Sequence, residues 1–145
     1  MTIAAALWVW QNPGWMAPPT LLSTGAERVN ARFTRCGPGR GPACVADGDT
    51  FKLGTRKIRI ASIDAPEVRP PRCTEEARLG EAATAALQKW LNRGPFTMRG
   101  WAHRPTDRFG RELMTVSRGA SDVGVELVRA GLAKPYAGSK AEWCA

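Results

Sequence analysis

Residues 43–64 read ACVADGDTFKLGTRKIRIASID and carry the clearest pattern of strands in the chain. It predicts three short strands, at residues 43–47, 50–54 and 56–64, because each piece alternates or runs apolar over four to six residues. The pairs Asp47-Gly48 and Gly54-Thr55 between them are turn signals typical of tight hairpins. Such strands indicate a small antiparallel sheet.

Beyond this stretch the pattern changes to a helix, two more strands and a second helix. Residues 74–92 carry apolar side chains at helical spacing, although Gly80 leaves open a start nearer residue 80. Strands are expected at 95–102 and 112–119, and a short helix follows an N-cap at Ser121 or Asp122. Five antiparallel strands, with one helix between the third and fourth and another after the fifth, predict an α+β fold built on an OB-type barrel.

The composition is that of one globular, basic domain. Of the 145 residues 43% are hydrophobic, which argues against a disordered chain, and the length suits a single core. Twenty-one Lys and Arg against 13 Asp and Glu give a net charge of +8, which favours polyanions such as nucleic acid or anionic lipid. A solvated basic surface without a partner is the alternative. His103 is the only histidine, so two-histidine zinc sites are excluded.

The four cysteines are dispersed and form no CxxC, which excludes zinc ribbons and thioredoxin-type motifs. An even, dispersed set suggests disulfides, and we expect Cys36 to pair with Cys44 and Cys73 with Cys144. Such pairs are typical of the periplasm or of secreted proteins. Four reduced thiols in a cytoplasmic protein are the alternative.

Residues 1–30 are predicted to be a separate amino-terminal segment, and residues 31–145 the domain. The apolar run at residues 3–10 is too short to span a bilayer and is nearer to a signal-peptide core, but no basic residue precedes it. Ala26 or Ala31 would each follow a small-x-small cleavage pattern. A signal remnant, a membrane-associating anchor and a flexible tail remain open.

Acidic side chains gather where the predicted strands turn. Asp47 and Asp49 flank Gly48, and Asp64 and Glu67 follow the third strand. Crowded carboxylates beside a buried strand are costly without a cation, and two carboxylates with a backbone carbonyl suit a hard ion such as calcium. For the first pair alone, a plain hairpin turn is the alternative.

Two arginines complete the pattern. Arg59 lies five positions before Asp64, and Arg111 directly precedes the fifth predicted strand. A guanidinium offers a planar fork of donors that matches phosphate. Around a metal ion and a spare carboxylate, two such groups would hold a phosphodiester and stabilise the charge that develops when water attacks phosphorus.

Together the motifs closely resemble the thermonuclease family, that is, staphylococcal-nuclease-like proteins, from about residue 44 to residue 136. They are VADGDTFKL, KIRIASIDAPE, a Gly-Glu-Ala helix, DRFGRELMTV and VELVRAGLAKPY, in the family's order. The resemblance implies an OB-type barrel and a calcium-dependent nuclease. It would hydrolyse the P–O5′ bond of single-stranded or denatured DNA and RNA with low sequence specificity, as a monomer.

The resemblance also implies a role for individual residues. It makes Asp49, Asp64 and the carbonyl of Ala65 the calcium ligands, with Asp47 and Thr50 as their neighbours. Glu67 matches the general base, and Arg59 and Arg111 match the arginines that hold the scissile phosphate.

Substrate contacts are expected from Phe109 and Tyr136. Phe109 stands where many members of the family have tyrosine, so one hydroxyl is missing. Tyr136 would stack on a base or, alternatively, pack in the core. A non-catalytic nucleic-acid-binding module and an envelope-associated structural protein of the same fold are the competing functions. Pure binding needs no carboxylate base or metal ligands. For the envelope protein the sequence has no glycan-binding aromatic platform, although its six tryptophans leave that function open.

Overall fold

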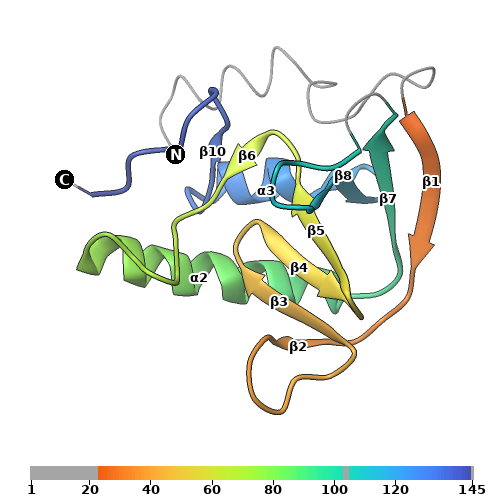
Figure 1. The fold of residues 1–145 in the computed structure, drawn as a ribbon, viewed down its shortest axis with the longest axis horizontal. Coiled ribbons are helices and arrows are strands. Elements are labelled where there is room, and N and C mark those ends of the chain that lie inside the picture. The colour runs from red at the N-terminus through yellow and green to blue at the C-terminus, as the bar shows by residue number, and fades with distance from the viewer. Residues whose placement is uncertain (1–22, 103–104, 145) are drawn as a thin grey trace.

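The structure is a computed structural model that describes residues 23–102 and 105–144 (Figure 1). The apolar run at residues 3–10 and His103 therefore lie outside the described residues. The elements, in chain order, are β1 (Ser23–Val29), β2 (Phe33–Arg35), β3 (Ala43–Asp47), β4 (Thr50–Leu53), β5 (Arg56–Ile60), β6 (Ile63–Asp64), α2 (Thr74–Leu91), β7 (Phe96–Trp101), β8 (Glu112–Arg118), β9 (Ser121–Asp122), α3 (Val123–Arg129) and β10 (Lys134–Pro135).

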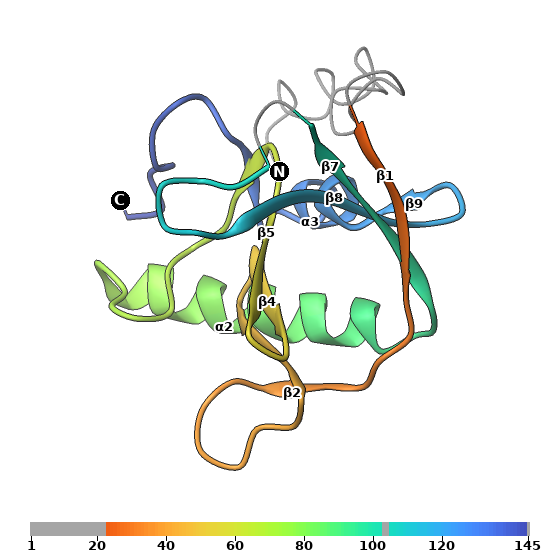
Figure 2. The same ribbon diagram turned by 45° about the vertical axis from the view of Figure 1, so that its right-hand side comes forward.

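The main sheet curls into a barrel-like shape. Its strand order is β1-β7-β8-β5-β4-β3-β2, with β9 paired to β8. The two ends of this path, β1 and β2, are consecutive in the chain, so the sheet must bend until its edges approach each other. Figure 2 shows β1, β7, β8 and β5 curling round a common centre, with α2 passing beneath them. The predicted OB-type α+β fold is confirmed.

The pairing differs from the expected all-antiparallel sheet in two places. β5 pairs with β8 in parallel, with Ile58 opposite Glu112, and β2 pairs with β3 in parallel. The connection from β5 to β8 runs through α2 and β7, which gives the chain the length that a parallel pair needs.

Aromatic rings form the centre of the core. The rings of Phe33, Phe51 and Phe96 lie 5.5 to 6.2 Å apart, and Trp90 of α2 lies 5.9 Å from Phe96. All four side chains are at most 2% exposed. The apolar residues that the sequence places at helical spacing therefore lie on one face of α2, and this face packs against the concave side of the sheet.

Helix α2 begins at Thr74, so the alternative start nearer Gly80 is wrong. Glu75 and Glu76 lie in its first turn, where carboxylates favour the helix. Gly80 is buried inside the helix, and a Cβ there would lie 3.0 Å from the carbonyl oxygen of Glu67 and 3.1 Å from that of Pro66. Glycine at this position lets residues 66–67 pack directly on the helix.

Strand β1 lies within the segment that the sequence separated from the domain. It pairs antiparallel with β7, with Glu27 opposite Met98 and Val29 opposite Phe96. The predicted boundary between residues 30 and 31 thus falls just after a strand of the main sheet. Ala26, one of the two predicted cleavage positions, lies inside this strand.

Both predicted disulfides are present. Cys36–Cys44 closes the loop between β2 and β3, and Cys73–Cys144 joins the residue that caps α2 to the end of the chain. In residues 23–102 and 105–144, no helix is both long enough and apolar enough to cross a membrane.

Candidate active site

The turn between β3 and β4 is pressed against α2. A Cβ on Gly48 would lie 2.6 Å from Ala83 Cβ of the helix and 2.9 Å from Ala65 Cβ, closer than carbon atoms approach. Glycine is thus required by space, and it brings Asp47 and Asp49 next to the segment after β6. Helix α2 serves as the common support for both acidic motifs, since Gly80 supports residues 66–67 in the same way.

Asp49 is 6% exposed and is held from three directions. Its Oδ1 accepts a hydrogen bond from Thr50 Oγ1 at 3.0 Å, and its Oδ2 accepts one from the Ala65 amide at 3.0 Å. Arg59 Nη2 lies 3.6 Å from the same Oδ2. Burial alone would raise the pKa of Asp49, but the Arg59 charge and these hydrogen bonds lower it overall.

Asp47 lies in the same turn as Asp49, and no ion pair of its side chain is found in residues 23–102 and 105–144. Its Oδ1 accepts a hydrogen bond from the Asp49 amide at 3.1 Å, which forms the tight turn. Burial, followed by the negative charge of Asp49, raises the pKa of Asp47 to about 8. The raised pKa is the expected result of burying Asp47 beside the carboxylates of Asp49 and Glu67.

Asp64, in β6, is 4% exposed and faces the carboxyl-terminal tail. Its Oδ1 accepts a hydrogen bond from Lys140 Nζ at 3.0 Å, and its Oδ2 accepts one from the Ala141 amide at 2.8 Å. The same ammonium lies 3.3 Å from the carbonyl oxygen of Ala65 and 2.9 Å from Glu67 Oε1. One lysine thus contacts three oxygen atoms of the predicted site.

The two predicted arginines lie on the same acidic cluster. Arg59 donates through Nη1 to the carbonyl of Ile60 at 2.6 Å, and its Nη2 is 3.9 Å from Asp64 Oδ1. Arg111 is fixed by Asp107, which accepts from its Nε at 2.7 Å and from its amide at 2.9 Å. Arg111 Nη1 then lies 3.4 Å from the Thr50 hydroxyl, which links this arginine to Asp49.

The structure therefore brings eight of the predicted residues into one connected cluster. They are Asp47, Asp49, Thr50, Arg59, Asp64, Ala65, Glu67 and Arg111.

The two predicted substrate contacts lie on the surface. Phe109 is 62% exposed, with the guanidinium carbons of Arg108 and Arg111 lying 4.8 and 5.4 Å from its ring centre. Tyr136 is 50% exposed, so it is not a core residue. Its amide donates to the carbonyl of Ser62 at 2.9 Å, which places it beside the turn before β6.

Lys140 and Asp107 are the site residues that the sequence prediction missed. Asp107 begins the DRFGR motif, so the sequence shows its position, but only the structure shows that it accepts a hydrogen bond from Arg111. The predicted Cys73–Cys144 disulfide placed the tail near the site, but no spacing rule indicated which tail side chain would enter it.

The predicted ligands are all oxygen atoms, the donor type that hard divalent cations take. In the described parts of the chain, no three His, Cys, Asp or Glu side chains are arranged to hold a metal ion. The predicted set has only two ligating carboxylates, and the tail holds one of them, Asp64. Yet the Lys140 ammonium is itself a cation held by three oxygens, which shows that this position can hold positive charge.

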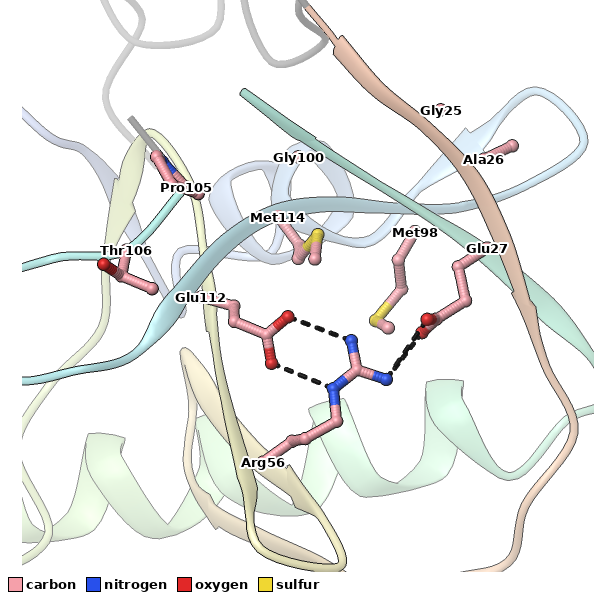
Figure 3. Close-up of a pocket in the computed structure, with 10 residues that line it drawn as sticks. All are labelled: Gly25, Ala26, Glu27, Arg56, Met98, Gly100, Pro105, Thr106, Glu112 and Met114. Carbon is pink, nitrogen blue, oxygen red and sulfur yellow. Dashed lines mark hydrogen bonds and ion pairs between the residues drawn. The ribbon is translucent and has the colours of Figure 1, made fainter. Parts of the chain in front are cut away.

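A pocket of about 660 Å³ lies elsewhere, between β1, β7, β8 and the start of β5 (Figure 3). Arg56 bridges its walls by hydrogen bonds to Glu112, at 2.9 and 3.0 Å, and to Glu27, at 2.9 and 3.1 Å. None of its described lining residues belongs to the predicted site.

Comparison with known proteins gives two relatives. Endonuclease YhcR of Bacillus subtilis (strain 168) is 34% identical over 102 residues, 63% of this chain and 8% of that protein. Succinoglycan biosynthesis protein ExoI of Rhizobium meliloti (strain 1021) is 34% identical over 96 residues, 63% of this chain and 49% of that protein. The chain spans about half of one relative's length and a small part of the other's.

A family model described as staphylococcal nuclease homologue matches residues 57–143. This range contains Arg59, Asp64, Glu67 and Arg111, and the fold brings the preceding Asp47-Gly48-Asp49 turn onto the same cluster. Because the match covers more than half of the chain and the fold agrees with it, the chain belongs to the staphylococcal nuclease homologue family.

Proposed function

We propose that the protein is a calcium-dependent nuclease. Its substrates would be single-stranded or denatured DNA and RNA, cleaved with low sequence specificity. The observation that carries this proposal is the connected cluster that contains Asp49, Asp64, Glu67, Arg59 and Arg111. Membership of the nuclease family and the relative named as an endonuclease support it.

Asp49, Asp64 and the carbonyl of Ala65 would hold the calcium ion. Their oxygens suit calcium, and a bound ion would relieve the crowding of Asp47 against the negative charge of Asp49. When bound, the ion would neutralise a phosphate oxygen and favour attack at phosphorus. Thr50 and the Ala65 amide keep the Asp49 carboxylate in a fixed orientation.

Glu67 would accept a proton from the attacking water, whose oxygen forms the new bond to phosphorus. The P–O5′ bond then breaks, the phosphate remains on the 3′ oxygen, and the 5′ oxygen takes a proton from solvent. The Glu67 side chain is 35% exposed, so water has access to it.

Arg59 and Arg111 would bind the non-bridging phosphate oxygens and stabilise the extra negative charge of the pentacoordinate transition state. Asp107 accepts from Nε of Arg111 and the Thr50 hydroxyl from Nη1, which leaves the remaining N–H groups of the two terminal nitrogens for phosphate. Phe109 and Tyr136, both exposed, are proposed to contact the bases or sugars of a single strand by stacking.

Two disulfides favour an oxidising compartment, so we propose that the protein is periplasmic or secreted. We also propose that it is a monomer, as the family resemblance implies.

The test is cleavage of denatured DNA and of RNA of mixed sequence, with calcium and with calcium plus chelator, followed by end-group analysis. We expect cleavage only with free calcium and products with 3′-phosphate and 5′-hydroxyl ends. Cleavage that continues in excess chelator would overturn the calcium dependence. Binding of nucleic acid without cleavage under any divalent ion would instead favour the binding or envelope-associated alternative. The relative named as a succinoglycan biosynthesis protein is an observation on the side of the envelope-associated alternative.

A further inference from the structure

The carboxyl-terminal tail, residues 137–144, puts a lysine into the proposed cation position. Lys140 Nζ lies 3.0 Å from Asp64 Oδ1, 3.3 Å from the Ala65 carbonyl oxygen and 2.9 Å from Glu67 Oε1. The first two atoms belong to residues proposed as calcium ligands, and the third belongs to the proposed base. No other described lysine or arginine contacts all three of these residues.

The tail is fastened on both sides of Lys140. Cys144 is bonded to Cys73 at the start of α2, and Arg72 Nη2 donates to the Ala141 carbonyl at 2.8 Å. Before Lys140, β10 pairs with β6 and places the tail beside Asp64. In Figure 1 the tail runs from β10 toward the amino-terminal end of α2. These attachments give the ammonium a high effective concentration at the site.

We propose that the Lys140 ammonium competes with a divalent cation for the cation position. Lys140 keeps the site closed until the divalent cation displaces it. This inference rests on the proposed function, because it concerns the same carboxylates. A calcium ion bound to Asp64 would need an oxygen that the tail now occupies, since Oδ1 is bonded to Lys140 and Oδ2 to the Ala141 amide. Glu67, paired with Lys140, is likewise engaged by the tail in the closed arrangement.

Two features allow the ammonium to leave. The Lys140 side chain is 34% exposed, so it has a path into water. The docked tail also buries the indole Nε1 of Trp143, which has no hydrogen-bond partner in the part of the chain that the structure describes. A buried donor without an acceptor weakens the closed arrangement, and opening the tail would hydrate it.

The direct test is calcium binding measured by isothermal titration calorimetry, without nucleic acid. The variant Lys140→Gln keeps most of the side-chain length and removes the charge. Lys89→Gln is the matched control, because it removes an exposed lysine from the last turn of α2. We expect Lys140→Gln to bind calcium at least about tenfold more tightly than the wild type, since charge-assisted bonds no longer compete. Lys89→Gln should bind like the wild type.

Equal dissociation constants in all three proteins would overturn the competition and leave the proposed nuclease intact. Absence of calcium binding in all three would overturn the proposed metal site and the competition with it. Cleavage by the wild type in excess chelator that is lost in Lys140→Gln would also overturn it, because the ammonium would then serve as the site's own cation.

A second measurement needs no variant. Hydrogen exchange of the Ala141 amide, which donates to Asp64 Oδ2, should become faster when calcium is added to the wild type. Exchange that is unchanged while calcium binds would show that the tail stays docked, and would contradict displacement.

Discussion

Replacing Gly48 by alanine adds one methyl group between two segments that already touch. The new Cβ would lie 2.6 Å from Ala83 Cβ and 2.9 Å from Ala65 Cβ, whereas carbon atoms in contact lie about 3.5–4.0 Å apart. Gly48 is not among the glycines with positive φ, so the backbone conformation itself accepts alanine. Any loss of stability or activity in Gly48→Ala therefore comes from the steric clash of the new methyl group.

The turn must move away from α2 by about 1 Å to restore ordinary contact distances. Overpacking of this kind costs about 1–3 kcal/mol, or several degrees in Tm for a domain of this size. Because Gly48 lies between Asp47 and Asp49, the same shift pulls Asp49 from the Ala65 amide, now 3.0 Å away. A misplacement of about 1 Å can lower activity about a hundredfold.

The free energy of unfolding, from urea titration, and the cleavage rate at saturating calcium measure the two effects. Gly41→Ala is the control, since its nearest neighbour would be at an ordinary 3.6 Å. We expect that variant to lie within about 0.5 kcal/mol of the wild type. If Gly48→Ala unfolds at the same urea concentration as Gly41→Ala and cleaves normally, α2 does not position the acidic turn as described here.

Three further predictions concern stability and chemistry. The Arg72 guanidinium, through its hydrogen bonds, holds the pKa of buried Glu76 at about 2, below the usual 4.5. The stability advantage of the wild type over Glu76→Gln should therefore be full above about pH 5 and shrink by about 3 kcal/mol as pH falls toward 2, in urea titrations across this range. Removing the Cys73–Cys144 disulfide, which spans 71 residues, should lower the free energy of unfolding by about 4.4 kcal/mol, whereas removing Cys36–Cys44, which spans eight, should lower it by about 2.5 kcal/mol. Thermal unfolding of the two double-serine variants measures this difference, and a larger loss for Cys36–Cys44 would contradict it. Arg111→Lys should lower the single-turnover rate constant of cleavage about 10²–10³-fold, because lysine lacks the planar guanidinium that would bond Asp107 and phosphate at the same time. A loss under threefold would refute that role.

The sequence predicted the parts of the fold that follow from local patterns. Alternation between Ala43 and Ile60, broken by Gly48 and Gly54, is enough to mark β3, β4 and β5. Strand β1 was not predicted, because its sequence STGAERV has little of the apolar alternation that marks a strand. It exists through pairing with β7, about 70 residues away, and such contacts leave no local signal.

The sequence predicted the site residues that lie in local motifs, but it missed the residue that a long-range contact brings in. Asp49, Asp64 and Arg59 lie at turns or strand ends, and their residue types point to cation and phosphate chemistry directly. The contact between Lys140 and Asp64 joins residues 76 positions apart. It depends on the path of an irregular tail fastened by a disulfide, so only the structure could reveal it.

The cleavage rate of a Glu67→Gln variant on denatured DNA at saturating calcium, measured beside the wild type, tests the assignment of the active site directly. Glu81→Gln is the matched control, because Glu81 lies on the surface of α2 and pairs with Arg35. The proposed base predicts that Glu67→Gln still binds calcium and DNA but cleaves about 10²–10⁴-fold more slowly, while Glu81→Gln cleaves like the wild type. A Glu67→Gln protein that cleaves at the wild-type rate would contradict the assignment of this cluster as the active site.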